Sequence, residues 1–178
     1  KPKEIAEIPG VSIVAGTEDK FNIIDQIESV KSISSATILH SNIDSVMNFN
    51  PSYSSDERTR SFLKIQDGCD YTCSYCTIPL ARGKSRSASI ANTIRQAEEI
   101  AKTNAKEIVL TGVNIGDFGN DNRENFYELI QNLEKIEGID RYRISSIEPN
   151  LLTDEIIEFT LNSDKFLPHF HIPLQSGS

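Results

Sequence analysis

The sequence of 178 residues contains no tryptophan, a single methionine (Met47) and three cysteines. No stretch approaches the ~20 apolar residues that a membrane-spanning helix requires. The opening Lys1-Pro2-Lys3-Glu4 is not followed by an apolar segment, so there is no signal peptide to recognise. Because the sequence has no starting methionine, we expect an excised or truncated segment. A charged fraction of 25% is ordinary and disfavours wholesale disorder.

Negative charge predominates, with 18 Lys and Arg against 26 Asp and Glu and a net charge of −8. This balance disfavours nucleic-acid binding over the whole surface. The segment from Arg58 to Arg86 is different, because it contains six basic residues and only two acidic ones, Asp67 and Asp70. This basic island consists of Arg58, Arg60, Lys64, Arg82, Lys84 and Arg86. It suggests a local anion site, and the alternative is chance clustering on a solvated loop.

The three cysteines lie within eight residues, at Cys69, Cys73 and Cys76. Three thiols cannot pair completely and no secretory signal is present, so a disulfide scaffold is disfavoured. A reducing, cytoplasmic compartment and a metal site are the natural interpretation.

Spacing alone favours an iron–sulfur cluster over zinc. A cubane of four irons normally takes four thiolates, so three would leave one iron with an open coordination position. A structural zinc site needs four ligands, and the sequence has no fourth cysteine. His40, His169 and His171 are remote in sequence, although folding could bring one of them in. Zinc binding and a loop of free thiols therefore remain alternatives.

The first 60 residues divide by composition. The pattern of residues 1–31 predicts a strand at 11–15 and a helix at 21–30. One strand and one helix cannot form a hydrophobic core alone, so these residues resemble the end of a domain. Residues 32–60 are rich in serine and asparagine and predict a linker with a short strand near 37–39.

From residue 61 onward, strands and helices alternate without a hairpin signal. This order predicts an α/β fold of parallel strands joined by right-handed crossovers, either an open sheet or a barrel. Four strands do not complete an eight-stranded barrel, so we expect a partial domain. The predicted strands are 62–66, 107–111, 141–145 and 169–174, and the predicted helices follow Ser89, span 126–136 up to Gly138, and follow Thr153.

The cysteines belong to a longer run of motifs that resembles the radical S-adenosylmethionine (SAM) superfamily, specifically its methylthiotransferases. The likeness covers residues 61–178 in the family's order. Its first blocks are Gln66-Asp67-Gly68-Cys69, Tyr75-Cys76, Pro79, Arg82-Gly83 and Ser85-Arg86, and the later ones are residues 110–114, 144–149 and 169–178. Residues 63–69 and 110–116 look most like the branch that acts on N6-threonylcarbamoyladenosine of tRNA.

The resemblance implies a domain organisation. Residues 61–178 are similar to the first part of an incomplete TIM-type barrel, and residues 1–31 resemble the end of the preceding α/β domain, with 32–60 as linker. In the family that preceding domain holds a second cluster on three cysteines of its own, none of which occurs here. The RNA-binding domain would lie beyond residue 178. We therefore expect a fragment that is inactive alone.

The resemblance also implies cofactors and partners. The three cysteines would bind a 4Fe–4S cluster whose open iron chelates SAM, and one electron from an electron donor would yield a 5′-deoxyadenosyl radical. That radical removes a hydrogen atom from the acceptor, which then receives a methylthio group. The partner is tRNA, held mainly by parts outside this chain, with the basic island near its phosphates. No membrane partner is expected.

Seven further residues are implied as cofactor-binding, each with a plain structural alternative. Tyr75 would lie near the adenine, Gly112 would let the methionyl group approach, and Glu148 would bind ribose hydroxyls or the amino group. These three and the other candidates are Tyr75, Gly112, Glu148, Arg82, Arg86, Asn114 and Gln175. The alternatives are a surface ring, a strand-end turn and solvated side chains. His169 and His171 share one face of a predicted strand and are expected to pack inside the barrel.

Three classes of function remain open on the sequence. The favoured one is the tRNA methylthiotransferase core, with isopentenyladenosine or a ribosomal-protein aspartate as alternative acceptors. The second is another radical enzyme with the same cysteine loop. The third is a noncatalytic metal-binding module, which a metal assay would distinguish.

Overall fold

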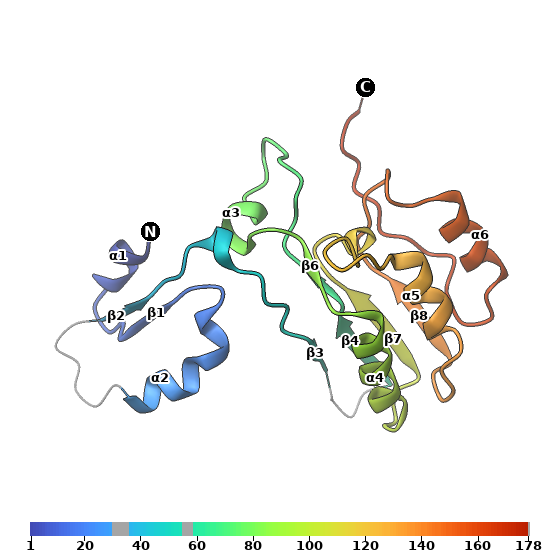
Figure 1. The fold of residues 1–178 in the computed structure, drawn as a ribbon, viewed down its shortest axis with the longest axis horizontal. Coiled ribbons are helices and arrows are strands. Elements are labelled where there is room, and N and C mark those ends of the chain that lie inside the picture. The colour runs from blue at the N-terminus through green and yellow to red at the C-terminus, as the bar shows by residue number, and fades with distance from the viewer. Residues whose placement is uncertain (30–35, 55–58, 178) are drawn as a thin grey trace. The chain divides into compact units, whose positions relative to one another are not determined.

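The computed structural model describes residues 1–29, 36–54 and 59–177. The chain forms two compact units (Figure 1). The smaller unit comprises Lys1–Asn48 and Thr72–Lys84, and the larger comprises Phe49–Tyr71 and Ser85–Ser178. Several sequence predictions lie outside the described residues: Arg58 of the basic island, Val30 at the end of a predicted helix, parts of the predicted linker, and Ser178.

The smaller unit has a two-stranded parallel sheet. Its strands β1 (Ile13–Ala15) and β2 (Thr37–Leu39) pair in the register Ile13 with Thr37, and both were predicted. The helices of this unit are α1 (Pro2–Ala6), α2 (Ile23–Ser29) and α3 (Ile78–Arg82), with short 3-10 turns at Asp19–Asn22 and Ile43–Ser45. Helix α3 joins the unit through the Thr17 hydroxyl, which donates to the Ala81 carbonyl at 2.8 Å.

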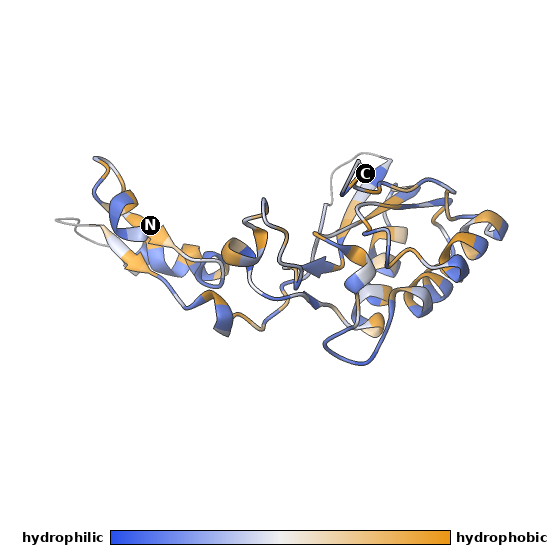
Figure 2. Ribbon diagram, turned by 90° about the horizontal axis from the view of Figure 1, so that it is seen from above, coloured by the Kyte–Doolittle hydropathy of each residue, from blue (hydrophilic) through white to orange (hydrophobic). Residues whose placement is uncertain are grey.

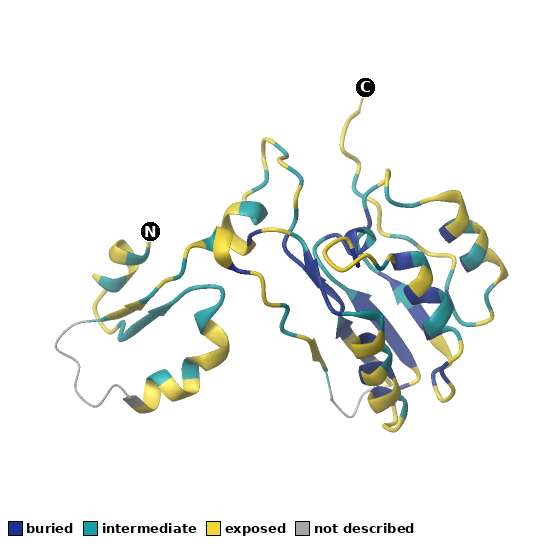
Figure 3. Cartoon of the chain, in the orientation of Figure 1, coloured by how far each residue is buried: buried dark blue, intermediate teal, exposed yellow. Residues whose placement is uncertain are grey.

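Little of the smaller unit is buried. Two three-residue strands cannot cover a helix, and the apolar residues Ile24 and Ile27 of α2 are 69% and 59% exposed. Figure 2 shows hydrophobic stretches on this unit, and Figure 3 shows the same region as exposed or half-buried. The apolar residues whose spacing predicted the helix therefore form a stripe that is not covered by the described residues of this unit.

The larger unit is organised around a four-stranded sheet in the order β3-β4-β7-β8. Its strands are β3 (Ser52–Tyr53), β4 (Arg60–Lys64), β7 (Glu107–Thr111) and β8 (Arg141–Ile144). Strands β4, β7 and β8 are parallel, as predicted, with Leu63 opposite Leu110 and Leu110 opposite Ile144. Strand β3 is antiparallel to β4 and lies within the predicted linker, where only a strand near 37–39 was expected.

Three helices of the larger unit begin close to their predicted positions. Helix α4 (Ile90–Ala101) is capped by Ser89, whose hydroxyl accepts the Asn92 N–H at 3.2 Å. Helix α5 (Phe126–Leu133) is capped in the same way by Asn125. Helix α6 (Asp154–Asn162) follows Thr153 and carries two acidic residues in its first turn, where the helix dipole favours them.

The core lies between one face of the sheet and these helices. Its fully buried members alternate along the strands, as the two-residue period of a strand requires. Figure 3 shows this buried layer in dark blue. Each large side chain contributes about 1.5–3 kcal/mol by burial. The core includes Leu63, Ile108, Leu110, Tyr142, Ile144, Ile100, Leu129, Leu133 and Phe166.

The predicted fourth strand at 169–174 is wrong. These residues are all described, and only His171 pairs with the sheet, through a single parallel contact with Ser146. The Ile147 N–H donates to the His171 carbonyl at 3.2 Å. Pro168 and Pro173 lack the N–H groups that a longer ladder needs, which accounts for the interruption. No helix among the described residues has the length and apolarity to cross a membrane.

Candidate functional site

The cysteines are carried by a loop with a paired base. Strand β5 (Gln66–Asp67) follows β4 directly and pairs antiparallel with β6 (Arg86–Ser87). The predicted strand 62–66 is thus divided at Ile65 into two short strands. We call residues 68–85, which this two-stranded stem closes, the cysteine loop.

None of the three cysteines forms a disulfide, and all three are partly buried. Cys69 belongs to the larger unit, whereas Cys73 and Cys76 belong to the smaller and share a turn in which the Cys76 N–H donates to the Cys73 carbonyl at 3.0 Å. Among the described residues, no three His, Cys, Asp or Glu side chains are grouped to hold a metal ion. The donor chemistry fits an iron–sulfur cluster, because thiolates are its protein ligands. The metal-binding role of the cysteines remains a prediction.

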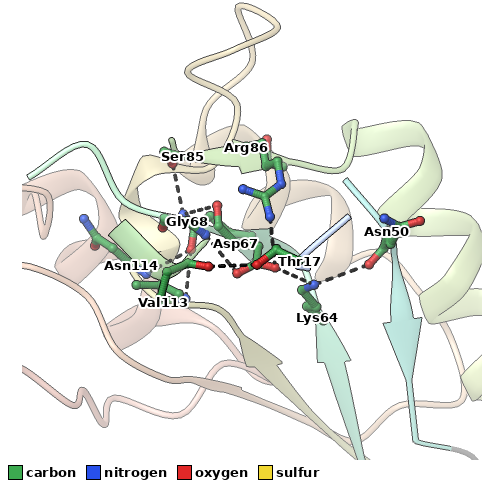
Figure 4. Close-up of polar contacts among 12 residues, drawn as sticks. Thr17, Asn50, Lys64, Asp67, Gly68, Ser85, Arg86, Val113 and Asn114 are labelled. Carbon is green, nitrogen blue, oxygen red and sulfur yellow. Dashed lines mark hydrogen bonds and ion pairs between the residues drawn. The ribbon is translucent and has the colours of Figure 1, made fainter. Parts of the chain in front are cut away.

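A buried ion-pair network lies at the base of the loop (Figure 4). The carboxylate of Asp67, 2% exposed, lies 2.9 Å from Lys64 Nζ and 3.4 Å from Arg86 Nη2. It also accepts the Gly68 N–H at 2.9 Å. Arg86 was predicted to hold a cofactor carboxylate, and in the structure its guanidinium contacts Asp67.

The basic island is therefore less cationic than its sequence indicates. Lys64 and Arg86 contact Asp67, and Arg60 Nε lies 2.8 Å from the buried carboxylate of Glu107. The long-range pair of Arg60 and Glu107 is not visible in local composition, which is why the sequence overestimates the anion-binding capacity of the island.

Gln66 occupies the centre of the site and has no exposed surface. Its Oε1 accepts the N–H groups of Val113 and Asn114, both at 2.9 Å. Its Nε2 donates to the Gly68 carbonyl at 2.8 Å and to the Ser85 hydroxyl at 2.9 Å. In the sequence Gln66 is part of a motif, and no role was predicted for it.

Gly112, at the end of β7, packs against the same side chain. A Cβ placed on it would lie 2.8 Å from Ile115 Cγ2 and 2.9 Å from Gln66 Oε1. In the structure, the side chains of Gln66 and Ile115 therefore occupy the space next to Gly112 that a larger residue would fill. The predicted approach of a methionyl group stays a prediction.

Three of the predicted residues, Asn114, Glu148 and Gln175, are joined by hydrogen bonds. The Oδ1 of Asn114 accepts the Glu148 N–H at 3.2 Å, and its Nδ2 donates to Asp117 Oδ2 at 3.1 Å. The Gln175 Nε2 donates to Glu148 Oε2 at 2.6 Å. Asn114 is buried and Glu148 is half-buried, so the carboxylate of Glu148 is accessible at the carboxyl end of β8.

Asp117 was not among the site residues predicted from the sequence. Burial raises the pKa of its carboxyl group, the nearby carboxylates of Asp70 and Glu148 raise it further, and the hydrogen bond from Asn114 opposes the rise. Asp117, beyond the end of β7, thus lies near two further carboxylates. Polar residues directly after buried parallel strands were the available signal, because such strand ends meet at one edge of the sheet.

The remaining predicted residues are more exposed. Tyr75 is 73% exposed, and Arg82, at the end of α3, is also exposed; both belong to the smaller unit. His169 and His171 are exposed, so their predicted packing is wrong, because they lie beyond Pro168 where no strand forms. His171 Nδ1 lies 3.0 Å from the Ser146 hydroxyl.

A parallel sheet with helices on one face and a three-cysteine loop after its first parallel strand define the class of protein. The sequence model of the radical SAM superfamily matches residues 63–178. The chain belongs to the radical SAM superfamily, as its motifs predicted.

Its relatives are more specific. The chain is 42% identical to the threonylcarbamoyladenosine tRNA methylthiotransferase MtaB of Bacillus subtilis, over 99% of this chain and 40% of that protein. The proteins of the same name from Aquifex aeolicus and Thermotoga maritima are 35% and 36% identical over 99% of this chain, which covers 44% and 40% of their lengths. The chain thus spans about two fifths of these curated relatives.

Proposed function

We propose that this chain forms the cofactor-binding core of a methylthiotransferase that modifies N6-threonylcarbamoyladenosine in tRNA. The observation that carries the proposal is the cysteine loop, which follows the first parallel strand of a region that belongs to the radical SAM superfamily. The names of the relatives from three bacteria support the acceptor.

The proposed cluster ligands are Cys69, Cys73 and Cys76, and the proposed cofactors are a 4Fe–4S cluster and SAM. When bound, the cluster and SAM supply one-electron chemistry that can activate an unreactive carbon. The residues of the chain would bind and orient the cofactor. The carboxylates of Glu148 and Asp117 complement a cationic ligand such as the amino group of SAM, and Asn114 fixes the backbone of Glu148.

The proposed fold of residues 61–178 is the first part of an incomplete TIM-type barrel. It is supported by the parallel strands β4, β7 and β8, with helices α4 and α5 between them in sequence. Residues 1–31 and 32–60 are proposed as the end of a preceding α/β domain and a linker. The proposed partners are tRNA and an electron donor, in the cytoplasm.

Cluster binding is tested by anaerobic reconstitution of the chain with iron and sulfide. We expect about four irons per chain and an EPR spectrum of the reduced protein that changes on adding SAM. Adenosine, which lacks the amino and carboxylate groups, is the control ligand and should leave the spectrum unchanged. Substituting each cysteine by serine should lower the iron content. Zinc binding, or iron whose spectrum ignores SAM, would overturn the proposal.

The acceptor is tested in cells. The complete gene that contains this sequence is expressed in a bacterial strain whose tRNA retains N6-threonylcarbamoyladenosine without the methylthio group, and tRNA nucleosides are analysed by mass spectrometry. We expect the methylthio derivative of that nucleoside. A second candidate acceptor is dimethylallyladenosine, because a tRNA-2-methylthio-N(6)-dimethylallyladenosine synthase of Hydrogenobaculum is 33% identical over 98% of this chain. Modification of that nucleoside alone would favour the second candidate.

A further inference from the structure

We infer that Gln66 is a positioning residue that holds both ends of the cysteine loop on the carboxyl end of β7. The inference rests on the proposed function only in so far as the loop binds a cluster. The hydrogen bonds themselves belong to residues of the larger unit and are independent of any cofactor.

The side-chain amide of Gln66 uses its whole hydrogen-bonding capacity. The oxygen has two lone pairs and accepts two backbone N–H groups, those of Val113 and Asn114. The nitrogen has two hydrogens and three acceptors, the carbonyls of Asp67 (3.1 Å) and Gly68 and the Ser85 hydroxyl.

The orientation of this amide follows from its partners. Backbone N–H groups can only donate and backbone carbonyls can only accept, so the oxygen must face Val113 and Asn114 while the nitrogen faces Asp67 and Gly68. A carboxylate at this position would keep the acceptor side and lose the donors. A leucine would lose both the acceptor and the donors and leave the buried N–H groups of Val113 and Asn114 unpaired. An unpaired buried N–H group destabilises the fold more than one that water can reach.

The partners of Gln66 are the points where the cysteine loop begins and ends. Gly68 directly precedes Cys69, and Ser85 closes the loop, where its N–H also donates to Asp70 Oδ1 at 3.0 Å. On the other side, Val113 and Asn114 follow β7. One amide thus fixes the first cluster ligand in the chain relative to the residues proposed to bind SAM. The absence of a side chain on Gly112 provides the space for it.

The experiment compares Gln66→Leu and Gln66→Glu with the same substitutions at Gln96. Gln96 is a matched control, because it is also buried, lies on α4, and makes one weak hydrogen bond to the Asn92 carbonyl at 3.4 Å. The first readout uses the chain without metal: the alkylation rate of each cysteine, measured by mass spectrometry in folded protein. The second is the iron retained per folded chain after reconstitution.

We expect Gln66→Leu to raise the alkylation rate of Cys69 by at least about fivefold, which is the effect of losing one of the several hydrogen bonds that keep the loop closed. Gln66→Glu should also raise the rate, because it places a buried carboxylate oxygen against the Asp67 and Gly68 carbonyls, and both variants should retain less iron. The Gln96 variants should match the unsubstituted chain in both readouts. Equal alkylation rates in the Gln66 and Gln96 variants would overturn the inference.

Two outcomes separate this inference from the proposed function. If the unsubstituted chain binds no cluster, the proposed function fails while the alkylation rates still test Gln66. If Gln66→Leu does not fold, Ser85→Ala takes its place, because it removes one partner of the amide at the half-buried end of the loop. A Cys69 rate unchanged by Ser85→Ala would then count against the role of Gln66.

Discussion

The side-chain oxygen of Asn114 accepts the backbone N–H of Glu148 at 3.2 Å and thereby joins the carboxyl ends of β7 and β8. The two residues are 34 positions apart in sequence and follow the neighbouring parallel strands β7 and β8. The amide nitrogen of Asn114 meanwhile donates to Asp117. The hydrogen bond from Glu148 to Asn114 fixes the backbone position from which the carboxylate of Glu148 projects.

Asn114→Ala should lower the free energy of unfolding by about 1–3 kcal/mol, because it leaves buried polar partners without a hydrogen bond. Urea unfolding followed by circular dichroism measures the change. Asn132→Ala is the control, since the side-chain bonds of Asn132 are exposed: it donates to the Glu128 carbonyl at 2.8 Å and accepts from Lys135 Nζ at 3.4 Å. Equal decreases in the free energy of unfolding of the two variants would contradict a stabilising role for the buried hydrogen bonds of Asn114.

Asp117 makes stability depend on pH. Its pKa is raised in the folded chain by burial and by the carboxylates of Asp70 and Glu148, so near that pKa the folded state binds more protons than the unfolded state. The stability contributed by this group is present below the ordinary aspartate value of about 3.9 and is lost as the pH rises through the raised value. Asp117→Asn should flatten this fall. Urea midpoints across the acidic range measure it, and unchanged curvature would contradict the assignment.

Glu107 joins three arginines on one carboxylate. Its oxygens lie 2.8 Å from Arg60 Nε, 3.4 Å from Arg143 Nε and 3.5 Å from Arg141 Nε, and its side chain is buried while the arginines are partly exposed. Glu107→Gln should lower the free energy of unfolding by about 1–3 kcal/mol, between the values for exposed and buried pairs.

The loss at Glu107 should be larger at low salt, where repulsion among the arginines is screened least. Urea unfolding at two salt concentrations measures this dependence. Glu98→Gln, on the exposed face of α4, should have little effect at either concentration. A salt-independent loss at Glu107 would contradict the role of charge repulsion among the three arginines.

Gly112→Ala should destabilise the larger unit by about 1–3 kcal/mol, the usual effect of overpacking. The new Cβ would lie 2.8 Å from Ile115 Cγ2 and 2.9 Å from Gln66 Oε1, so at least one side chain must move. Gly177→Ala is the matched control, because nothing lies within 4 Å of its Cβ position. Differential scanning calorimetry compares the two, and equal transition temperatures would refute the close contact.

The elements that the sequence predicted well are those governed by local patterns. Strand β7 (Glu107–Thr111) was predicted to the residue, because an almost continuous apolar run is typical of a strand buried on both faces. Helix α4 was predicted from an apolar stripe and a serine cap. Both signals are complete within about a dozen residues.

The parts that were missed depend on contacts distant in sequence. The β5–β6 stem consists of two-residue strands that carry no detectable period. The bonds from Gln66 to Val113 and Asn114 span 47 and 48 positions, and no local pattern encodes them. The predicted fourth strand, 169–174, follows Pro168 and contains Pro173, and neither proline has the N–H group that a ladder needs. The site was thus predictable in its cysteines and strand ends, and not in the amide that links them.

The boundary between the two compact units is crossed three times by the backbone, after Asn48, after Tyr71 and after Lys84. A single proteolytic cut therefore cannot release either unit as one uninterrupted polypeptide. Exchanging the smaller unit with that of a relative would require two grafts, and the second would carry Cys73 and Cys76 while leaving Cys69 behind. Chimeras of this protein are consequently best joined outside residues 69–76, so that all three thiols come from one parent.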